Sequence, residues 1–94
     1  MKWFKGAPDL LRFSGEGACI SVNIPDGPRA GAFLTALDEA AIEAQGRLNL
    51  IKNAHTDAET AARAFPAYEE MRTRLKAWDP KRVFRSAMSE RLGL

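Results

Sequence analysis

The sequence predicts an α+β fold in which a small sheet of two to three strands has a crossover helix and is followed by C-terminal helices. Three observations lead to this class: apolar and polar residues alternate over 18–24, apolar residues recur at helical spacing over 28–45, and helix start and stop signals follow residue 56. With 94 residues and 10.4 kDa, the chain can form one small domain with a modest core. Apolar residues make up 46% and charged residues 28%, so we expect a packed core rather than disorder.

The first elements are predicted to be extended. An apolar run over 10–13, followed by the turn signal Gly15-Glu16-Gly17, indicates the entry to a hairpin. Strict alternation over 18–24 then predicts a strand, with Cys19 as a small packing residue in it. The apolar face of this strand is expected to hold Ala18, Ile20, Val22 and Ile24.

A helix is predicted from Pro28 to about Gln45. Asp26 or Gly27 can cap it, Pro28 suits the first helical position, and Gly46 suits the C-terminal stop. The side chains expected to face the core are Phe33, Leu34, Leu37, Ala41 and Ala44. The side chains expected in solvent are Asp38, Glu39 and Glu43.

A further strand is predicted over 47–52, with Leu48 and Leu50 on one face and Lys52 at its end. Two strands joined by a long helix form a crossover unit, which favours parallel pairing.

The remaining elements are predicted to be helices. Thr56 and Glu59 have capping-box spacing, Phe65-Pro66 interrupts the helix that they start, and the next helix is expected over 67–78. This helix should bury Tyr68, Met71 and Leu75, with Trp78 as a further candidate, and Asp79-Pro80 should end it. Ser86 can cap a last turn or two through Leu92.

Charge is distributed unevenly along the chain. Residues 1–70 carry seven basic and ten acidic side chains, whereas 71–94 carry seven and two. The basic tail over 71–94 could meet phosphate or an acidic partner, and a solvated helix face explains it as simply. Trp3 and Phe4 lie among lysines, yet single-strand binders use platforms of several aromatic residues, so nucleic-acid binding ranks last. The sequence shows no span-length apolar run and no signal peptide, so we expect a cytoplasmic protein.

Most catalytic motifs are missing from the sequence. It contains no phosphate-binding glycine loop, no histidine pair for a metal and no serine in an elbow sequence. The single histidine, His55, is interpreted as structural or solvated. Lys52 is the remaining candidate, because an ammonium at a strand end can point into a cleft and stabilise developing negative charge; a surface lysine is the simpler interpretation from spacing alone.

One specific pattern lies near the C-terminus: Asp79-Pro80-x-Arg82-Val83-Phe84-x-Ser86-x-Met88-x-x-Arg91-Leu92. Three shorter segments precede it: Gly46-Arg47-Leu48 with Lys52, Thr56 with Ala58-Glu59-Thr60, and Phe65-Pro66. With these segments the chain from Phe13 to Leu94 resembles the C-terminal portion of FAD-linked oxidases of the vanillyl-alcohol-oxidase type. The decaprenylphosphoryl-ribose oxidases are the nearest group and the aldonolactone oxidases are more distant.

The resemblance implies that residues 1–48 belong to the substrate domain and that 49–94 form a tail returning to the FAD-binding domain. Lys52 matches the family lysine at the flavin ring and substrate, which implies a catalytic and cofactor-binding role near the flavin N1 and C2 carbonyl. Asn49 matches a cofactor-side position where the nearest group has Tyr. Ser21 matches a substrate-side position where the nearest group has Cys. The identity of the substrate therefore stays open.

The resemblance implies an oxidoreductase that uses FAD to oxidise a sugar or sugar-lactone hydroxyl. The 94 residues include no FAD-binding domain, so we expect no FAD binding and no activity by this chain alone. It could be a truncated gene product, an isolated domain or one half of a split enzyme. We expect a homo-oligomer or a separate FAD-binding chain as partner. The alternative hypothesis is a non-enzymatic, self-associating interaction module that kept the fold and lost the chemistry.

Overall fold

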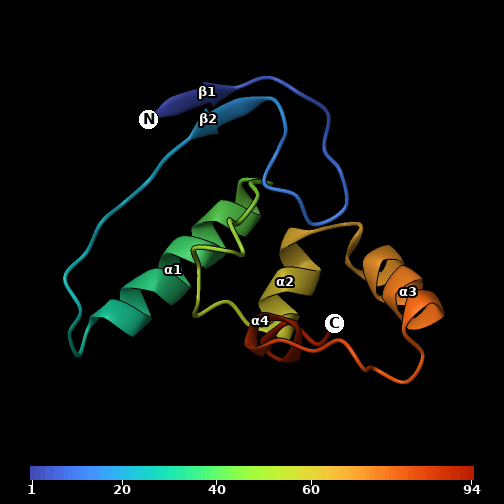
Figure 1. Cartoon of the computed structure of the whole chain (residues 1–94). Helices are drawn as coiled ribbons and strands as arrows, with labels where there is room; N and C mark the ends of the chain where they lie inside the picture. Colours follow the sequence, from blue (N-terminus) through green and yellow to red (C-terminus); the bar gives the residue numbers. More distant parts are fainter.

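The computed structural model consists of a short hairpin and four helices, which confirms the α+β class. The elements are β1 (Lys2–Phe4), β2 (Gly17–Cys19), α1 (Ala30–Glu43), α2 (Ala58–Ala64), α3 (Tyr68–Trp78) and α4 (Ala87–Arg91). The hairpin lies apart from the helices, and a long irregular segment joins β2 to α1 (Figure 1). None of the helices has the length and apolar character that crossing a bilayer requires.

The sheet differs from the expected one in strand extent and direction. β1 and β2 pair antiparallel, with Lys2 opposite Cys19 and Phe4 opposite Gly17. The strand predicted over 18–24 therefore ends at Cys19, because β1 offers only three residues to pair with. Beyond β2 the side chain of Ile20 is 73% exposed, so the alternation there marks no buried face.

The helix predicted over 28–45 is confirmed as α1, although it starts at Ala30. Its N-cap is Arg29, which makes no side-chain capping bond, so the predicted caps at Asp26 and Gly27 are wrong. At the other end, Gly46 donates its amide to the Ala41 carbonyl at 2.7 Å. A Cβ on Gly46 would lie 2.9 Å from that oxygen, so this stop requires glycine.

The segment over 47–52 is a turn, so the predicted second strand and the parallel crossover are wrong. The carbonyl of Asn49 accepts from the amides of Lys52, at 3.0 Å, and Asn53, at 2.8 Å. These backbone groups therefore bond within the turn, and the segment has no neighbouring strand with which to form sheet hydrogen bonds. Leu48 and Leu50 are nevertheless buried, as the alternation predicted.

The C-terminal helices follow the sequence signals closely, with one shift. The N-cap of α2 is Asp57, whose carboxylate accepts from the Thr60 amide at 2.8 Å, so the capping box predicted at Thr56 is wrong by one residue. Ser86 caps α4 as predicted. Its hydroxyl oxygen accepts the Ser89 amide, and the Ser89 hydroxyl oxygen accepts the Ser86 amide. Trp78 ends α3 with 82% of its surface exposed, so it is outside the core.

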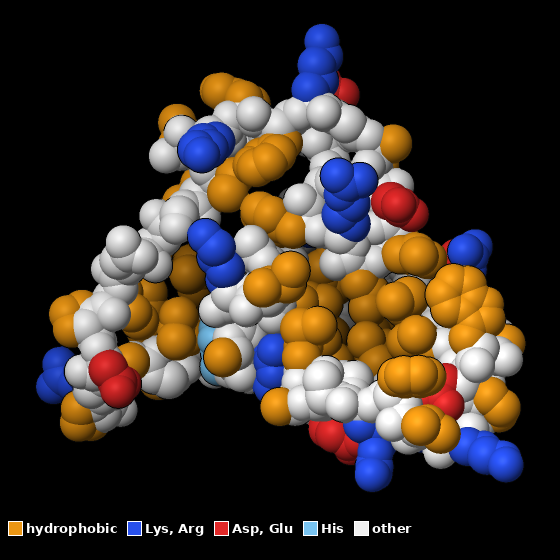
Figure 2. Space-filling view, viewed as in Figure 1, with side chains coloured by type: hydrophobic (Ala, Val, Ile, Leu, Met, Phe, Trp, Pro, Cys, Tyr) orange, Lys and Arg blue, Asp and Glu red, His pale blue; other side chains and the backbone are white.

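The core is small and lies between the Leu48–Leu50 segment and the three C-terminal helices. Only nine residues are buried. The apolar ones are Leu48, Leu50, Ala61, Ala64, Phe65, Tyr68 and Leu92. From the predicted stripe of α1, only Ala41 packs against this cluster, while Phe33 and Leu37 are 47% and 40% exposed. Apolar side chains gather on the visible face around α2 and α3 (Figure 2).

Candidate functional site

The structure places two of the three predicted site residues in one turn. Asn49 opens the segment 49–56, here called the Lys52 loop, and its carbonyl accepts the Lys52 amide. Asn49 is half-buried, and Lys52 is exposed with no ion pair. Ser21 lies exposed in the irregular segment after β2, and it forms no hydrogen bond with either residue. A backbone hydrogen bond therefore joins Asn49 to Lys52, and no hydrogen bond joins Ser21 to either residue.

The tip of the Lys52 loop points outward because its neighbours are anchored. Leu48 is 4% exposed and Leu50 is 6% exposed, whereas Ile51 is 83% exposed. Lys52 follows Ile51 at the same exposed tip. An ammonium presented in this way is available to a group outside the chain.

Arg91 of α4 holds the Lys52 loop from one side. One terminal nitrogen of its guanidinium donates to the carbonyls of Asn53 at 2.7 Å and Thr56 at 2.6 Å, and the other donates to the Leu50 carbonyl at 3.2 Å. In the sequence, Arg91 belongs to the basic tail and to the C-terminal pattern. Its membership of the C-terminal pattern was the only sequence signal for this role.

Asp38 of α1 holds the Lys52 loop from the other side. This carboxylate was expected in solvent, yet it is only 4% exposed. Its Oδ2 lies 2.8 Å from His55 Nε2 and accepts the Thr56 hydroxyl at 3.2 Å. These two partners satisfy a carboxylate that the core would otherwise exclude, and they give His55 a structural role.

A cavity of about 400 Å³ lies at the C-terminal ends of α1 and α2. Its lining includes Arg47 and Arg63. Arg47 donates to the Ala64 carbonyl at 3.2 Å, and Arg63 forms a bidentate pair with Glu39 at 2.7 and 2.6 Å. This pair lowers the pKa of Glu39 and raises the pKa of Arg63, chiefly through its hydrogen bonds. Both cations are thus already engaged, and the carbonyl ends of helices disfavour anions.

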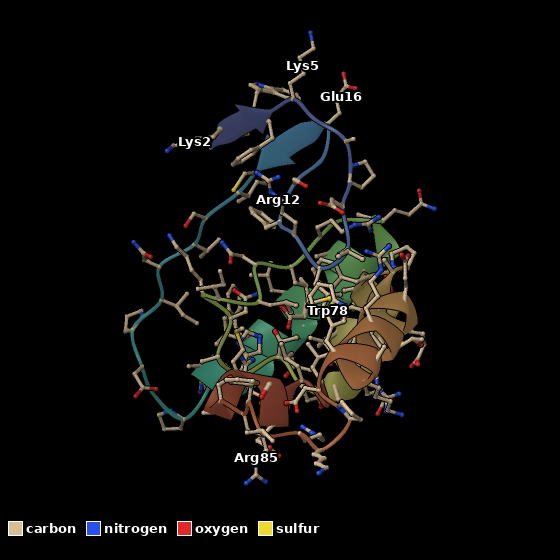
Figure 3. The ribbon with its side chains drawn as sticks, turned by 45° about the vertical axis from the view of Figure 1, so that its right-hand side comes forward. Lys2, Lys5, Arg12, Glu16, Trp78 and Arg85 are labelled. Carbon is tan, nitrogen blue, oxygen red and sulfur yellow. The ribbon has the colours of Figure 1, made fainter.

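The basic tail is largely paired within the chain. Arg72 pairs with Glu69, Arg74 with Glu70, and Arg82 bonds the Leu94 carbonyl near Glu90. Arg85 projects away from the body of the molecule (Figure 3). These partners fit the interpretation of a solvated helix face.

A turn after α3 presents two apolar side chains. The carboxylate of Asp79 accepts the amides of Val83 at 2.9 Å and Phe84 at 2.8 Å, and these bonds lower its pKa. Val83 and Phe84 are 70% and 88% exposed. They line a shallow cavity of about 350 Å³ together with Ser86 and its neighbours. Nothing inside the chain covers this turn.

Neither of the two cavities described above is lined by Ser21, Asn49 or Lys52. No group of three or more His, Cys, Asp or Glu side chains is placed to hold a metal ion.

Two curated proteins are similar to nearly the whole chain. An uncharacterized protein from the mprA 5′ region of Streptomyces coelicolor is 34% identical over 92 residues, which is 95% of this chain and 24% of that protein. Decaprenylphosphoryl-β-D-ribose oxidase of Mycolicibacterium smegmatis is 34% identical over 88 residues, which is 94% of this chain and 19% of the oxidase. The chain thus spans less than a quarter of the length of these relatives. No protein-family profile matches it, and no solved structure matches it.

Proposed function

We propose that this chain is the C-terminal portion of an FAD-dependent oxidoreductase that removes hydride from a sugar or sugar-lactone hydroxyl. The observation that carries the proposal is the similarity to an oxidase over 94% of the chain. A second observation supports it: the ammonium of Lys52 has no ion-pair partner and lies on a loop that Asp38 and Arg91 hold. The cytoplasmic location and the division at residues 48 and 49 stay predictions.

FAD, when bound, supplies the hydride acceptor. Lys52 would contribute its ammonium beside the N1 and C2 carbonyl edge, where a cation stabilises the negative charge of the reduced ring. Because no carboxylate of this chain pairs with Lys52, its charge is not already compensated. Asn49 would add a polar group on the cofactor side, and Ser21 one on the substrate side.

The accessible surface area of the chain is larger than that of a folded monomer of its mass, which supports the proposal that it packs against a partner domain. A folded monomer of 10.4 kDa exposes about 5,400 Å², whereas this chain exposes 7310 Å². The difference, about 1,900 Å², is roughly twice the area that one partner loses in a standard interface. An FAD-binding domain, on the same or another chain, is the partner that the proposal requires.

The proposal is tested by supplying an FAD-binding domain. The chain is co-expressed with the M. smegmatis oxidase lacking its matching 88 residues, and flavin reduction by decaprenylphosphoryl-β-D-ribose is followed. Lys52→Ala should lower the rate at least tenfold, by roughly 1.4 kcal/mol or more of transition-state stabilisation, and should lower the flavin midpoint potential. Lys76→Ala, an exposed lysine of α3, is the matched control. Restored activity that is the same with Lys52→Ala as with the unchanged chain would refute the proposal.

The second candidate is a self-associating interaction module without chemistry. The observation that favours it is the number of exposed large apolar side chains, including Trp3, Ile20, Trp78 and Phe84. Such a module would form a defined oligomer and take up no flavin.

A further inference from the structure

Arg91 uses its guanidinium almost entirely on the backbone of one loop. Its three acceptors are the carbonyls of Leu50, Asn53 and Thr56, at 3.2, 2.7 and 2.6 Å. No carboxylate pairs with it, although the side chain is part-buried. A cation with this set of partners fixes the course of the main chain rather than neutralising an acid.

Arginine suits these three acceptors better than lysine does. The carbonyls are reached from two different nitrogens of a planar, rigid group. A lysine ammonium donates from a single atom on a flexible stem, so it cannot reach the same set in the same geometry. The substitution Arg91→Lys therefore keeps the charge and removes the fixed spacing of the donors.

The base of Arg91 is itself fixed in the core. The next residue, Leu92, is 1% exposed, and its carbonyl accepts the Tyr68 hydroxyl at 2.5 Å. On its N-terminal side, α4 is closed by the reciprocal bonds between Ser86 and Ser89. The position of the guanidinium is thus set by packed residues of α3 and α4.

The Lys52 loop is held at both its ends and is free only at its tip. Asp38 of α1 bonds His55 and Thr56, while Arg91 bonds carbonyls on either side of Lys52. No hydrogen bond or ion pair uses the Lys52 side chain itself. A loop with fixed ends and one unpaired cation at its tip presents that cation in a defined place.

We propose that Arg91 is the positioning residue for Lys52: it holds the loop so that the ammonium meets the flavin edge. This inference rests on the proposed function of Lys52. A displacement of about 1 Å can lower a rate about a hundredfold. A loop that lets the Lys52 ammonium shift therefore lowers the rate of flavin reduction, as removal of the ammonium does.

The first measurement uses the chain by itself. Arg91→Lys should speed amide hydrogen exchange of Lys52, Asn53 and Thr56 about tenfold or more, because the carbonyls of the loop lose their fixed donors. Exchange of Met71 in α3 should change less than about twofold, which a general loss of stability would not allow. Arg74→Lys makes the same chemical change at an exposed ion pair and should leave all four amides unchanged. Equal acceleration in the loop and in α3 would overturn the inference.

The second measurement is a double-mutant cycle in the complex with the truncated M. smegmatis oxidase. Arg91→Lys should lower the rate of flavin reduction about tenfold and shift the flavin midpoint potential in the same direction as Lys52→Ala. In the Lys52→Ala background, Arg91→Lys should have little further effect, since there is no ammonium left to position. Independent, additive effects would overturn the inference and leave the proposed function standing. Absence of any Lys52→Ala effect would overturn both.

Discussion

Asp38 shows how one residue joins parts of the chain that sequence spacing keeps apart. It lies in the middle of α1, next to Glu39, and its partners His55 and Thr56 belong to the loop before α2. Removing the carboxylate would leave the buried Thr56 hydroxyl and one histidine nitrogen without a partner. The helical pattern placed Asp38 in solvent because a pattern of polarity cannot show a partner seventeen residues away.

Asp38→Ala should lower the free energy of unfolding by about 1–3 kcal/mol, the cost of leaving buried polar groups unpaired. Urea denaturation followed by circular dichroism measures this difference. Glu43→Ala, on the same helix but exposed, should change it by less than about 0.5 kcal/mol. An equal, small loss for both variants would show that Asp38 makes no net contribution.

The hydrogen bonds of the Asp79 carboxylate predict that the stability of the turn after α3 depends on pH. Its pKa lies below the ordinary value because the carboxylate accepts the Val83 and Phe84 amides. A pKa that is lowered in the folded state means that the turn is stabilised above the unfolded pKa. This stabilisation is lost as the pH falls through the lower, folded pKa. Amide exchange of Val83 and Phe84 should therefore accelerate in acid, below about pH 4, beyond its intrinsic pH dependence. Asp79→Asn should abolish the pH-dependent part, and a wild-type profile in that variant would contradict the assignment.

At the scale of elements, the helices were predictable and the strands were not. Helix signals are local: Ser86 and Ser89 cap α4, and Asp79-Pro80 ends α3, using residues within one turn of each other. A strand requires a partner, and the alternation over 18–24 carries no information on whether one exists. In this chain β1 is three residues long, so β2 is three residues long.

The reciprocal cap of α4 can be measured directly. Ser86→Ala should lower the free energy of unfolding by about 1 kcal/mol, because the Ser89 amide loses its acceptor in a helix of only five residues. Ser86→Gly should cost only a few tenths of a kcal/mol. Urea denaturation of the two variants compares them, and the reverse order of stability would show that the hydroxyl bond contributes little.

At the scale of the molecule, the chain is more open than its length requires. Its radius of gyration is 14.2 Å, compared with about 12 Å for a compact domain of this length. Large apolar side chains stay on the surface of separate elements: Trp3 of β1 is 80% exposed, and Trp78 at the end of α3 is 82% exposed. Exposed apolar side chains of this kind are the basis of the self-association that we expect.

We expect the purified chain to self-associate and to take up no FAD. Titration with FAD, followed by flavin absorbance and by sedimentation of the protein, tests both expectations. Indole fluorescence should shift to shorter wavelength as concentration rises, because association removes Trp3 or Trp78 from water. Stoichiometric flavin uptake would mean that an oligomer builds a flavin site, and a monomer at all concentrations would contradict self-association.

The candidate site was predictable only in part. Lys52 was a candidate because of its place at the end of a predicted strand and because of the resemblance. The structure has no strand there: Lys52 lies at an exposed tip beside Asn49, and its role stays a prediction. The residues that hold this tip, Asp38 and Arg91, were not predicted. Their partners are backbone carbonyls and a buried hydroxyl up to 41 residues away, and such contacts leave no local pattern in a sequence.

The contacts of Arg91 have a consequence for how this chain can evolve. All three acceptors are main-chain carbonyls, which every amino acid possesses. The hydrogen bonds of the guanidinium therefore do not depend on which side chains stand at the tip of the loop. Substitutions at Ile51, Lys52 or Ala54 can change the side chains that the tip presents without removing the bonds that hold it, so the chemistry and the position of the tip can vary independently.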